Sequence, residues 1–246
     1  MERLKAVVLA AGMGIRLRPL TYITPKCLIE VKGKPILENA LEHLNRNGIK
    51  AVIIVTGHLG RRVRKYFGNQ FHDIRLVYVE NTRFKETNNI YSLWLAREHL
   101  NDDILLLEGD VFFEGEVIDR VCKCKYPDVM VIDGYRDFMN GTGINTKRDI
   151  VTEIILNKGE HQDVHHKAKL KTVNIYKFSK GFLETHFIPA LDKCIMDNYH
   201  GEFYEFALAR IIKSKAVQLR ALSITGLRWF EVDTPEDWQK AQQLFG

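Results

Sequence analysis

The sequence predicts an α/β fold in which helices cover a doubly wound, mixed and mostly parallel sheet, with a smaller β region in the second half. Residues 5–10 form an apolar run, which is typical of a strand buried on both faces of a parallel sheet. Strand-like and helix-like patterns then alternate over the first 110 residues. The second half is less regular and contains more strand-like than helix-like segments.

Helical patterns separate the apolar strands of the first half. In residues 35–47 the apolar positions recur at helical spacing, Pro35 suits the first turn, and Gly48 suits the position after the last turn. The strands are expected at 5–10, 51–55, 75–79 and 104–107, and the helices at 35–47, 59–67 and 90–100.

The second half ends in a helix with a clear start signal. Thr234 is a good N-cap, with Pro235 at the first helical position and Asp237 at the third. No repeat or low-complexity linker divides the chain, so residues 1–246 are expected to form a single domain. Loops are expected at 141–146 and 161–169, strands at 129–132, 150–155, 172–178, 218–222 and 228–232, and two further helices at 180–197 and 203–213.

The composition is that of an ordinary soluble globular protein. The 246 residues are 46% hydrophobic and 27% charged, and no apolar run approaches the roughly 20 residues of a membrane span. The N-terminus lacks a signal-peptide pattern, so we expect a cytoplasmic protein without a membrane partner. Four scattered cysteines do not make a disulfide framework. The net charge of +5 suits small anionic substrates, and no arginine–aromatic interleaving indicates nucleic-acid binding.

A loop of small residues follows the first strand. Backbone N–H groups in such a loop can approach a ligand closely and bind phosphate. Leu17 stands where a dinucleotide fingerprint needs its third glycine, and no Gly-Lys-Ser/Thr of a P-loop follows. Arg16 and Lys26 can supply the positive charge that phosphoryl transfer requires. The alternative interpretation of this segment is a turn with two glycines and two solvent-exposed cations that bind no ligand. The expected nucleotide-binding residues of the loop are Leu9, Ala10, Ala11, Gly12, Met13 and Gly14.

This loop belongs to a long signature. It reads Leu9-Ala-Ala-Gly-Met-Gly-Ile-Arg-Leu-Arg-Pro-Leu-Thr, then Thr24-Pro-Lys26, then Val31-Lys-Gly-Lys-Pro35. The signature resembles that of the sugar-phosphate nucleotidyltransferases and their cytidylyltransferase relatives. The resemblance implies a nucleotidyltransferase fold of the GT-A-like Rossmannoid type, with residues 1–115 mainly binding the nucleotide and 116–246 mainly binding the acceptor. It also implies that Arg16 and Lys26 are the catalytic cations.

Later segments indicate a branch of that family. Residues 81–93, Asn-Thr-Arg-Phe-Lys-Glu-Thr-Asn-Asn-Ile-Tyr-Ser-Leu, resemble the bacterial phosphocholine cytidylyltransferases. Asn88 and Ser92 lie one turn apart at a helix start and can hydrogen-bond the nucleotide, whereas the alternative is an N-cap and a buried serine. Four later segments resemble the 2-aminoethylphosphonate cytidylyltransferases, namely 133–142, 171–179, 202–205 and 229–233. Those enzymes carry an acidic residue at the position of Asn140.

Two aspartates follow predicted strands. Asp110, in Glu108-Gly-Asp110, and Asp233 each close a strand, and ligands of open α/β sheets bind beyond the carboxyl ends of the strands. Taken alone, each aspartate can be interpreted either as a metal ligand or as a residue that forms a turn. Asp233 also suits the N-terminus of the last helix, where a negative charge is favourable. The resemblance implies that both bind the catalytic Mg²⁺, which takes few carboxylates together with phosphates and waters.

The acceptor site is expected in the second half. The resemblance places Lys158 where related enzymes hold the acceptor phosphate, with a solvated loop lysine as the alternative. A cationic acceptor head needs carboxylates or aromatic faces. His161, His165 and His166 have a spacing that a helix could aim at a metal, but a solvated loop is the favoured interpretation. The candidate residues for acceptor binding are Asp133, Asn174, Glu202, Tyr204, Glu205 and Trp229.

These features together predict a CTP-dependent cytidylyltransferase that acts on a small phosphonate or phosphate. The preferred acceptor is 2-aminoethylphosphonate, and phosphocholine or a sugar or polyol phosphate is the alternative. A catalytically silent nucleotide-binding homologue is the alternative of another class. A glycosyltransferase is disfavoured because Phe112 breaks the Asp-x-Asp motif that would begin at Asp110. The sequence leaves open whether the protein forms a homodimer.

Overall fold

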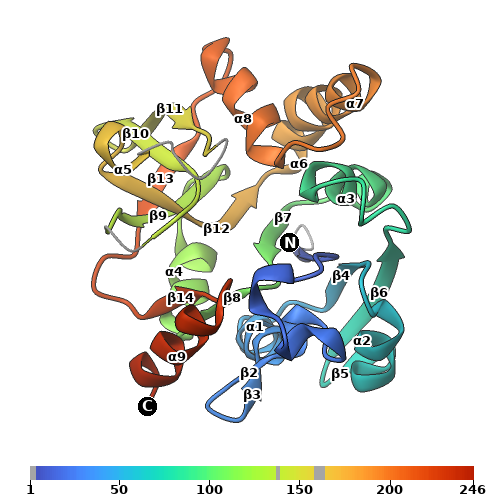
Figure 1. Cartoon of the computed structure of the whole chain (residues 1–246). Helices are drawn as coiled ribbons and strands as arrows, with labels where there is room; N and C mark the ends of the chain where they lie inside the picture. The colour runs from blue at the N-terminus through green and yellow to red at the C-terminus, as the bar shows by residue number, and fades with distance from the viewer. Residues whose placement is uncertain (1–3, 137–138, 158–163) are drawn as a thin grey trace.

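A ten-stranded mixed sheet runs through the molecule (Figure 1). The computed structural model describes residues 4–136, 139–157 and 164–246. In spatial order the strands are β10 (Gly143–Lys147), β11 (Ile150–Ile155), β13 (Arg220–Ser223), β9 (Val129–Gly134), β12 (Leu170–Phe178), β7 (Ile104–Glu108), β1 (Lys5–Ala10), β4 (Ala51–Thr56), β6 (Ile74–Glu80) and β5 (Gln70–Phe71).

The sheet changes character at β12. The block β7-β1-β4-β6 is entirely parallel, as the apolar runs of the first half predict. β12 runs antiparallel to both of its neighbours, β7 and β9. β11 likewise pairs antiparallel with β10 and β13. Among these described strands, only the pair of β9 and β13 is parallel. The mixed sheet is therefore confirmed. The expectation of mostly parallel pairing holds for the first half. The second half is mainly antiparallel, because β10 and β11 form a hairpin and β12 runs antiparallel between β7 and β9.

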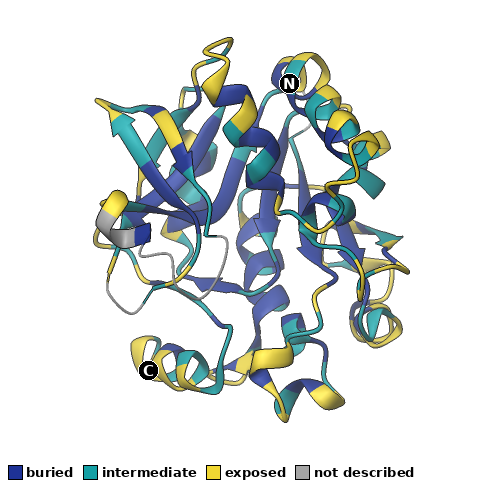
Figure 2. Ribbon diagram, turned by 45° about the horizontal axis from the view of Figure 1, so that its top comes forward, coloured by how far each residue is buried: buried dark blue, intermediate teal, exposed yellow. Residues whose placement is uncertain are grey.

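Helices cover both faces of the sheet, as a doubly wound fold requires. Alternate residues of β1 point to opposite sides, so that Val7 and Leu9 join one apolar core while Ala6 and Val8 join the other. The first core includes α3 (Asn89–Leu95), α7 (Ile188–Met196) and α8 (Tyr204–Lys213). The second includes α1 (Ile36–Arg46), α2 (Gly60–Phe67) and α4 (Glu116–Lys123). Figure 2 shows the buried sheet between partly exposed helices.

Short elements connect these layers. Two small ribbons, β2 (Glu30–Val31) with β3 (Lys34–Pro35) and β8 (Val111–Phe113) with β14 (Trp229–Glu231), lie outside the main sheet. Single turns of 3-10 helix occupy Ile15–Leu17, Leu20–Tyr22, Lys26–Leu28 and Arg97–His99. None of the helices in the described ranges is both long and apolar enough to cross a bilayer.

Three differences from the sequence-based expectations have local causes. Residues 141–146 were expected to be a loop, yet β10 forms there because it pairs with both β11 and β12. α5 (Val164–Lys167) adds one helical turn within the expected loop 161–169. The helix expected at 180–197 is present as α6 (Lys180–Phe182), a π-helical turn at Leu183–Phe187 and α7.

The predicted cap of the last helix, α9 (Pro235–Leu244), is confirmed. The Asp237 N–H donates to Thr234 Oγ1 at 3.1 Å, and the Thr234 N–H donates back to Asp237 Oδ2 at 3.0 Å. We expect Thr234→Ala to lower the free energy of unfolding by about 1 kcal/mol and the Tm by roughly 2–4 °C. Thermal unfolding followed by circular dichroism measures the change. The exposed Thr82→Ala is the control, and an equal loss in both variants would contradict the capping role.

Candidate active site

A pocket of about 950 Å³ opens at the carboxyl edge of the parallel block. Its wall contains the residues that follow β1, the start of α3, the turn after β7 and the end of β14. The pocket thus joins the two halves of the chain. Every residue of the small-residue loop lines it, namely Leu9, Ala10, Ala11, Gly12, Met13 and Gly14.

The loop keeps its shape because Gly14 accepts a conformation and a close contact that other residues do not. Gly14 has φ 58°, and a Cβ there would lie 2.9 Å from Thr21 Cγ2. The Thr21 hydroxyl donates to the Gly14 carbonyl at 2.7 Å and holds the turn. A Cβ at Gly109 would lie 3.0 Å from Ala10 Cβ. The chain after β7 therefore packs directly against the end of β1.

Lys26 joins the two predicted aspartates. Its Nζ donates to Asp110 Oδ2 and to Asp233 Oδ1, both at 2.6 Å. Arg16 pairs with the other oxygen of Asp233 at 2.9 Å. Four residues expected to act on the nucleotide or its metal, separated by more than 200 positions in the sequence, thus meet at one point.

The β8–β14 ribbon explains how Asp233 reaches Asp110. Glu231 lies opposite Val111 in this antiparallel pair, and the Val232 N–H donates to the Asp110 carbonyl at 2.9 Å. Burial lowers the pKa of Lys26, but the adjacent Asp110 and Asp233 carboxylates outweigh it and raise the pKa above its ordinary value. Burial likewise raises the pKa of Asp233, but Lys26 and Arg16 outweigh it and hold the pKa below its ordinary value.

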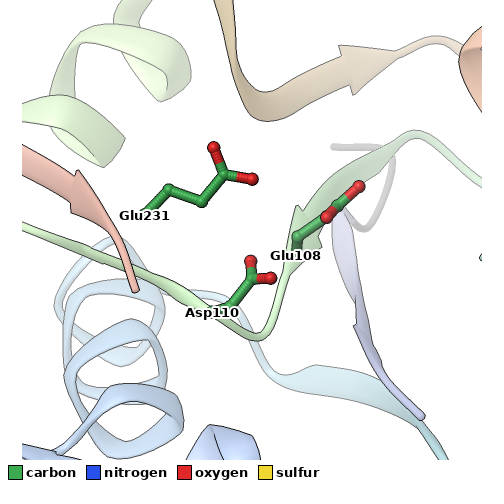
Figure 3. A group of neighbouring side chains, drawn as sticks. All are labelled: Glu108, Asp110 and Glu231. Carbon is green, nitrogen blue, oxygen red and sulfur yellow. The ribbon is translucent and has the colours of Figure 1, made fainter. Parts of the chain in front are cut away.

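Further carboxylates surround Asp110. Glu108, Asp110 and Glu231 each place one oxygen within 4.8 Å of the others, and Figure 3 shows the three side chains as neighbours. Lys171 Nζ donates to Glu231 Oε2 at 2.8 Å, and Asn174 Nδ2 donates to Oε1 at 3.1 Å. The sequence assigned no role to Glu108, Glu231 or Lys171. A signal was present, because each glutamate stands two positions before a predicted aspartate.

The cluster of carboxylate side chains around Asp110 is suited to binding a hard divalent cation. Asp110 Oδ1 is buried and has no hydrogen-bond partner within the described part of the chain, although its other oxygen is bound to Lys26. A buried carboxylate oxygen without a partner is unfavourable unless a donor or cation satisfies it. Mg²⁺ prefers oxygen ligands of this type. The assignment of Asp110 and Asp233 as metal ligands stays a prediction, and Glu108 and Glu231 are further carboxylates beside Asp110.

Both sequence interpretations of Asn88 and Ser92 are compatible with the structure. Asn88 caps α3, because its Oδ1 accepts from the Asn89 N–H at 2.8 Å, and Ser92 is buried and accepts from Asn81 Nδ2 at 3.0 Å. Both residues nevertheless line the pocket. They remain candidates for nucleotide binding.

The structure separates the acceptor candidates. Asn174, Glu202 and Glu205 line the pocket together with Asn140. Tyr204 is fully buried and is not among the described residues that line the pocket. The proposed role of Lys158 concerns a position outside the described residues, as does that of His161, and no side chain is described for His165 or His166.

Asp133 and Trp229, the two remaining acceptor candidates, contact each other. Trp229 donates its Nε1–H to Asp133 Oδ2 at 2.9 Å, and both residues are buried. Asp133 also accepts from Arg136 and Thr225. This contact holds β14 against β9, so these two side chains support the wall of the site. Neither is among the described residues that line the 950 Å³ pocket, but Trp229 lines a smaller cavity that shares Glu231 and Asp233 with it. Their role in acceptor binding stays a prediction.

A comparison with known families decides the broader assignment. Residues 5–125 match the model of the nucleotidyl transferase family. The chain belongs to this family. The α/β fold and the enzyme class expected from the sequence are confirmed at the family level.

Individual nucleotidyl transferase relatives resemble the chain over nearly its full length. It is 34% identical to the CMP-5'-(3-aminopropyl)phosphonate synthase of Streptomyces rubellomurinus over 98% of this chain, but it spans only 38% of that protein. It is 26% identical to the choline-phosphate cytidylyltransferase of Streptococcus pneumoniae, covering 98% of both chains. The solved CTP:phosphocholine cytidylyltransferase of the same organism has the same fold, with a TM-score of 0.79 at 23% identity, over 99% of this chain and 100% of that chain.

Proposed function

We propose that this protein is a Mg²⁺-dependent cytidylyltransferase that transfers CMP from CTP to a small amino-alkyl phosphonate or phosphate, with 2-aminoethylphosphonate as the preferred acceptor. The convergence of Lys26, Asp110 and Asp233 beside the Gly12–Gly14 loop carries the proposal. Cations, carboxylates and backbone N–H groups then surround the same place, as the positioning and charge neutralisation of phosphoryl transfer require.

The reaction is an in-line displacement at the α-phosphorus of CTP. An anionic oxygen of the acceptor forms the new P–O bond, the bond to the β-phosphate breaks, and pyrophosphate leaves with the electron pair. The attacking oxygen is already deprotonated, so no general base is required. The loop from Ala10 to Gly14 holds the nucleotide, while Arg16 and Lys26 neutralise charge on the phosphates.

Mg²⁺ supplies additional positive charge to the phosphates when it is bound. Asp110 and Asp233 would hold it, with Glu231 as a further carboxylate in reach. Lys26 bridges the same two aspartates. The ammonium group therefore keeps the carboxylates together until it engages the phosphates.

The relatives support cytidylyl transfer, and their names indicate two types of acceptor, an aminoalkyl phosphonate and choline phosphate. One acts with an aminopropylphosphonate and another with choline phosphate, according to their names. The pocket contains several carboxylates near Asn174, which suits an acceptor that carries both an anionic group and an ammonium group. A sugar phosphate offers no positive charge to these carboxylates.

A pyrophosphate-release assay tests the proposal. We expect release with CTP and 2-aminoethylphosphonate in the presence of MgCl₂, and at least roughly tenfold lower kcat/KM with UTP, GTP or ATP, since base contacts differing by one hydrogen bond change rates by about that factor. EDTA should abolish release. If CTP binds but no acceptor among aminoalkyl phosphonates, phosphocholine and sugar phosphates yields pyrophosphate, the protein is a silent nucleotide-binding homologue and the proposal fails.

A further inference from the structure

Glu205 is a buried carboxylate at the pocket wall whose hydrogen bonding is incomplete. It lies in the first turn of α8, lines the pocket and is only 3% exposed. Its Oε1 accepts from the Tyr176 hydroxyl at 3.3 Å, whereas Oε2 has no partner within the described ranges. Leaving a buried charged acceptor unsatisfied is costly, so a ligand donor is the natural partner for this oxygen.

The same part of the pocket contains a second carboxylate without a cation. Glu108 Oε1 accepts from Asn89 Nδ2 at 3.0 Å, and Asn89 Oδ1 accepts from the Tyr204 backbone N–H at 2.9 Å. Asn89 therefore links the end of β7 to the start of α8. Among the described residues no lysine, arginine or histidine forms an ion pair with Glu108 or Glu205.

The two glutamates affect each other electrostatically. Burial raises the pKa of Glu205 to about 7. The negative charges of Glu205 and Glu108 repel each other. Lys171, a buried cation whose charge acts on Glu205, is already bound to Glu231 at 2.8 Å. A cation entering the pocket would therefore relieve repulsion that Lys171 offsets only in part.

We propose that Glu205 and Glu108 bind the ammonium group of the acceptor through N–H donors and select a primary ammonium over a quaternary one. A primary ammonium offers three N–H donors to the unpartnered Glu205 oxygen and to Glu108. A trimethylammonium group offers none and is usually bound by several aromatic faces. Of the described residues that line the pocket, the aromatic ones are Phe84 and Phe203. This inference rests on the proposed function and identifies the residues that choose its acceptor.

Binding and turnover measured separately test this subsite. Titration calorimetry with CTP and EDTA present measures the Kd of 2-aminoethylphosphonate and of its N,N,N-trimethyl derivative. We expect the wild type to bind the primary amine about 10- to 100-fold more tightly, the range for one or two charge-assisted hydrogen bonds. Glu205→Gln should remove most of this preference by weakening amine binding, while binding of the trimethyl derivative changes by less than about threefold.

Glu184→Gln is the matched control, since this exposed side chain pairs only with Lys180 among described residues and lies outside the pocket lining. Equal affinity of the wild type for both acceptors would overturn the subsite, as would an unchanged preference in Glu205→Gln. If Glu205→Gln does not fold, the proposal is still tested by the affinities of the wild type for the two acceptors and by the same measurement on Glu108→Gln. Amine binding that depends on Glu205 without pyrophosphate release would support the subsite and refute the proposed function.

Discussion

Replacing Lys26 with methionine is expected to lower kcat/KM for pyrophosphate release on the order of 10³-fold, the upper part of the range for loss of one preorganised group that stabilises developing charge. Methionine keeps the length and apolar stem of the side chain but has no charge. The lost interaction is made with the phosphates as charge moves to the leaving group, so kcat should fall more than KM rises. Steady-state kinetics with CTP and 2-aminoethylphosphonate measure the effect.

The same substitution should change the metal-free protein in a second way. Lys26 is 13% exposed in its side chain and lies between Asp110 and Asp233, so its removal leaves two close carboxylates without their shared counter-charge. We expect the free energy of unfolding in EDTA to fall by about 2–3 kcal/mol, somewhat below the cost of breaking a fully buried pair. Divalent cations should bind more tightly to the nucleotide-free variant, because the competing ammonium group is absent.

Manganese titration followed by electron paramagnetic resonance measures that affinity, and thermal unfolding with EDTA or MgCl₂ measures the stability. The control is Lys50→Met, which removes a lysine from an exposed pair with Asp73 and should change neither quantity. Wild-type activity in Lys26→Met would refute the catalytic assignment. Unchanged manganese affinity would refute the competition between lysine and metal for the two aspartates.

Local sequence signals predicted the parts of the fold that depend on local physics. Residues 5–10 are apolar throughout apart from Lys5 and form the central strand, and Thr234 caps the last helix as its neighbours indicated. β10 was missed because Ile144 is its sole large apolar residue, and its stability comes from partner strands distant in sequence. Strand pairing of this kind has no signature within the strand itself.

The candidate site was predictable where residue type and strand-end position coincide. Asp110 and Asp233 follow strands, so their convergence with Lys26 could be expected. The contact between Asp133 and Trp229 could not be predicted, because a buried aspartate that accepts from an indole N–H looks the same in the sequence as one that faces a ligand. Only the packing of β14 against β9 distinguishes the two cases.

The choice between Glu205 and the other carboxylates also required the structure. Glu202 and Glu205 lie three positions apart at the start of α8, and nothing in their sequence context indicates which one is buried. The fold places Glu205 at 3% exposure, beside Tyr176 of β12. The second half of the sheet thus shapes the side of the pocket that we propose to bind the acceptor, because α8 packs against it.

Replacing Asp110 with asparagine is expected to abolish the response of the protein to Mg²⁺. The amide keeps the shape of the side chain but lacks the negative charge, and its nitrogen cannot act as a hard oxygen ligand. Lys26 retains its pair with Asp233, and the buried Oδ1 charge without a partner is removed, so the Tm in EDTA should fall by less than about 2 °C, corresponding to under ~1 kcal/mol. The loss of metal-assisted charge stabilisation should lower kcat/KM on the order of 10³-fold, equivalent to several kcal/mol.

Ligand-induced stabilisation separates this effect from misfolding. In the wild type, MgCl₂ with CTP at about 100 times its Kd should add about 2.7 kcal/mol of stability, which raises the Tm by roughly 5–10 °C. In Asp110→Asn this increment should be reduced to that of CTP alone. Asp73→Asn, which alters an exposed aspartate, should respond like the wild type. A full Mg²⁺-dependent increment in Asp110→Asn would show that the cation is held elsewhere, and the carboxylates of Glu108 and Glu231 would then be the next residues to replace.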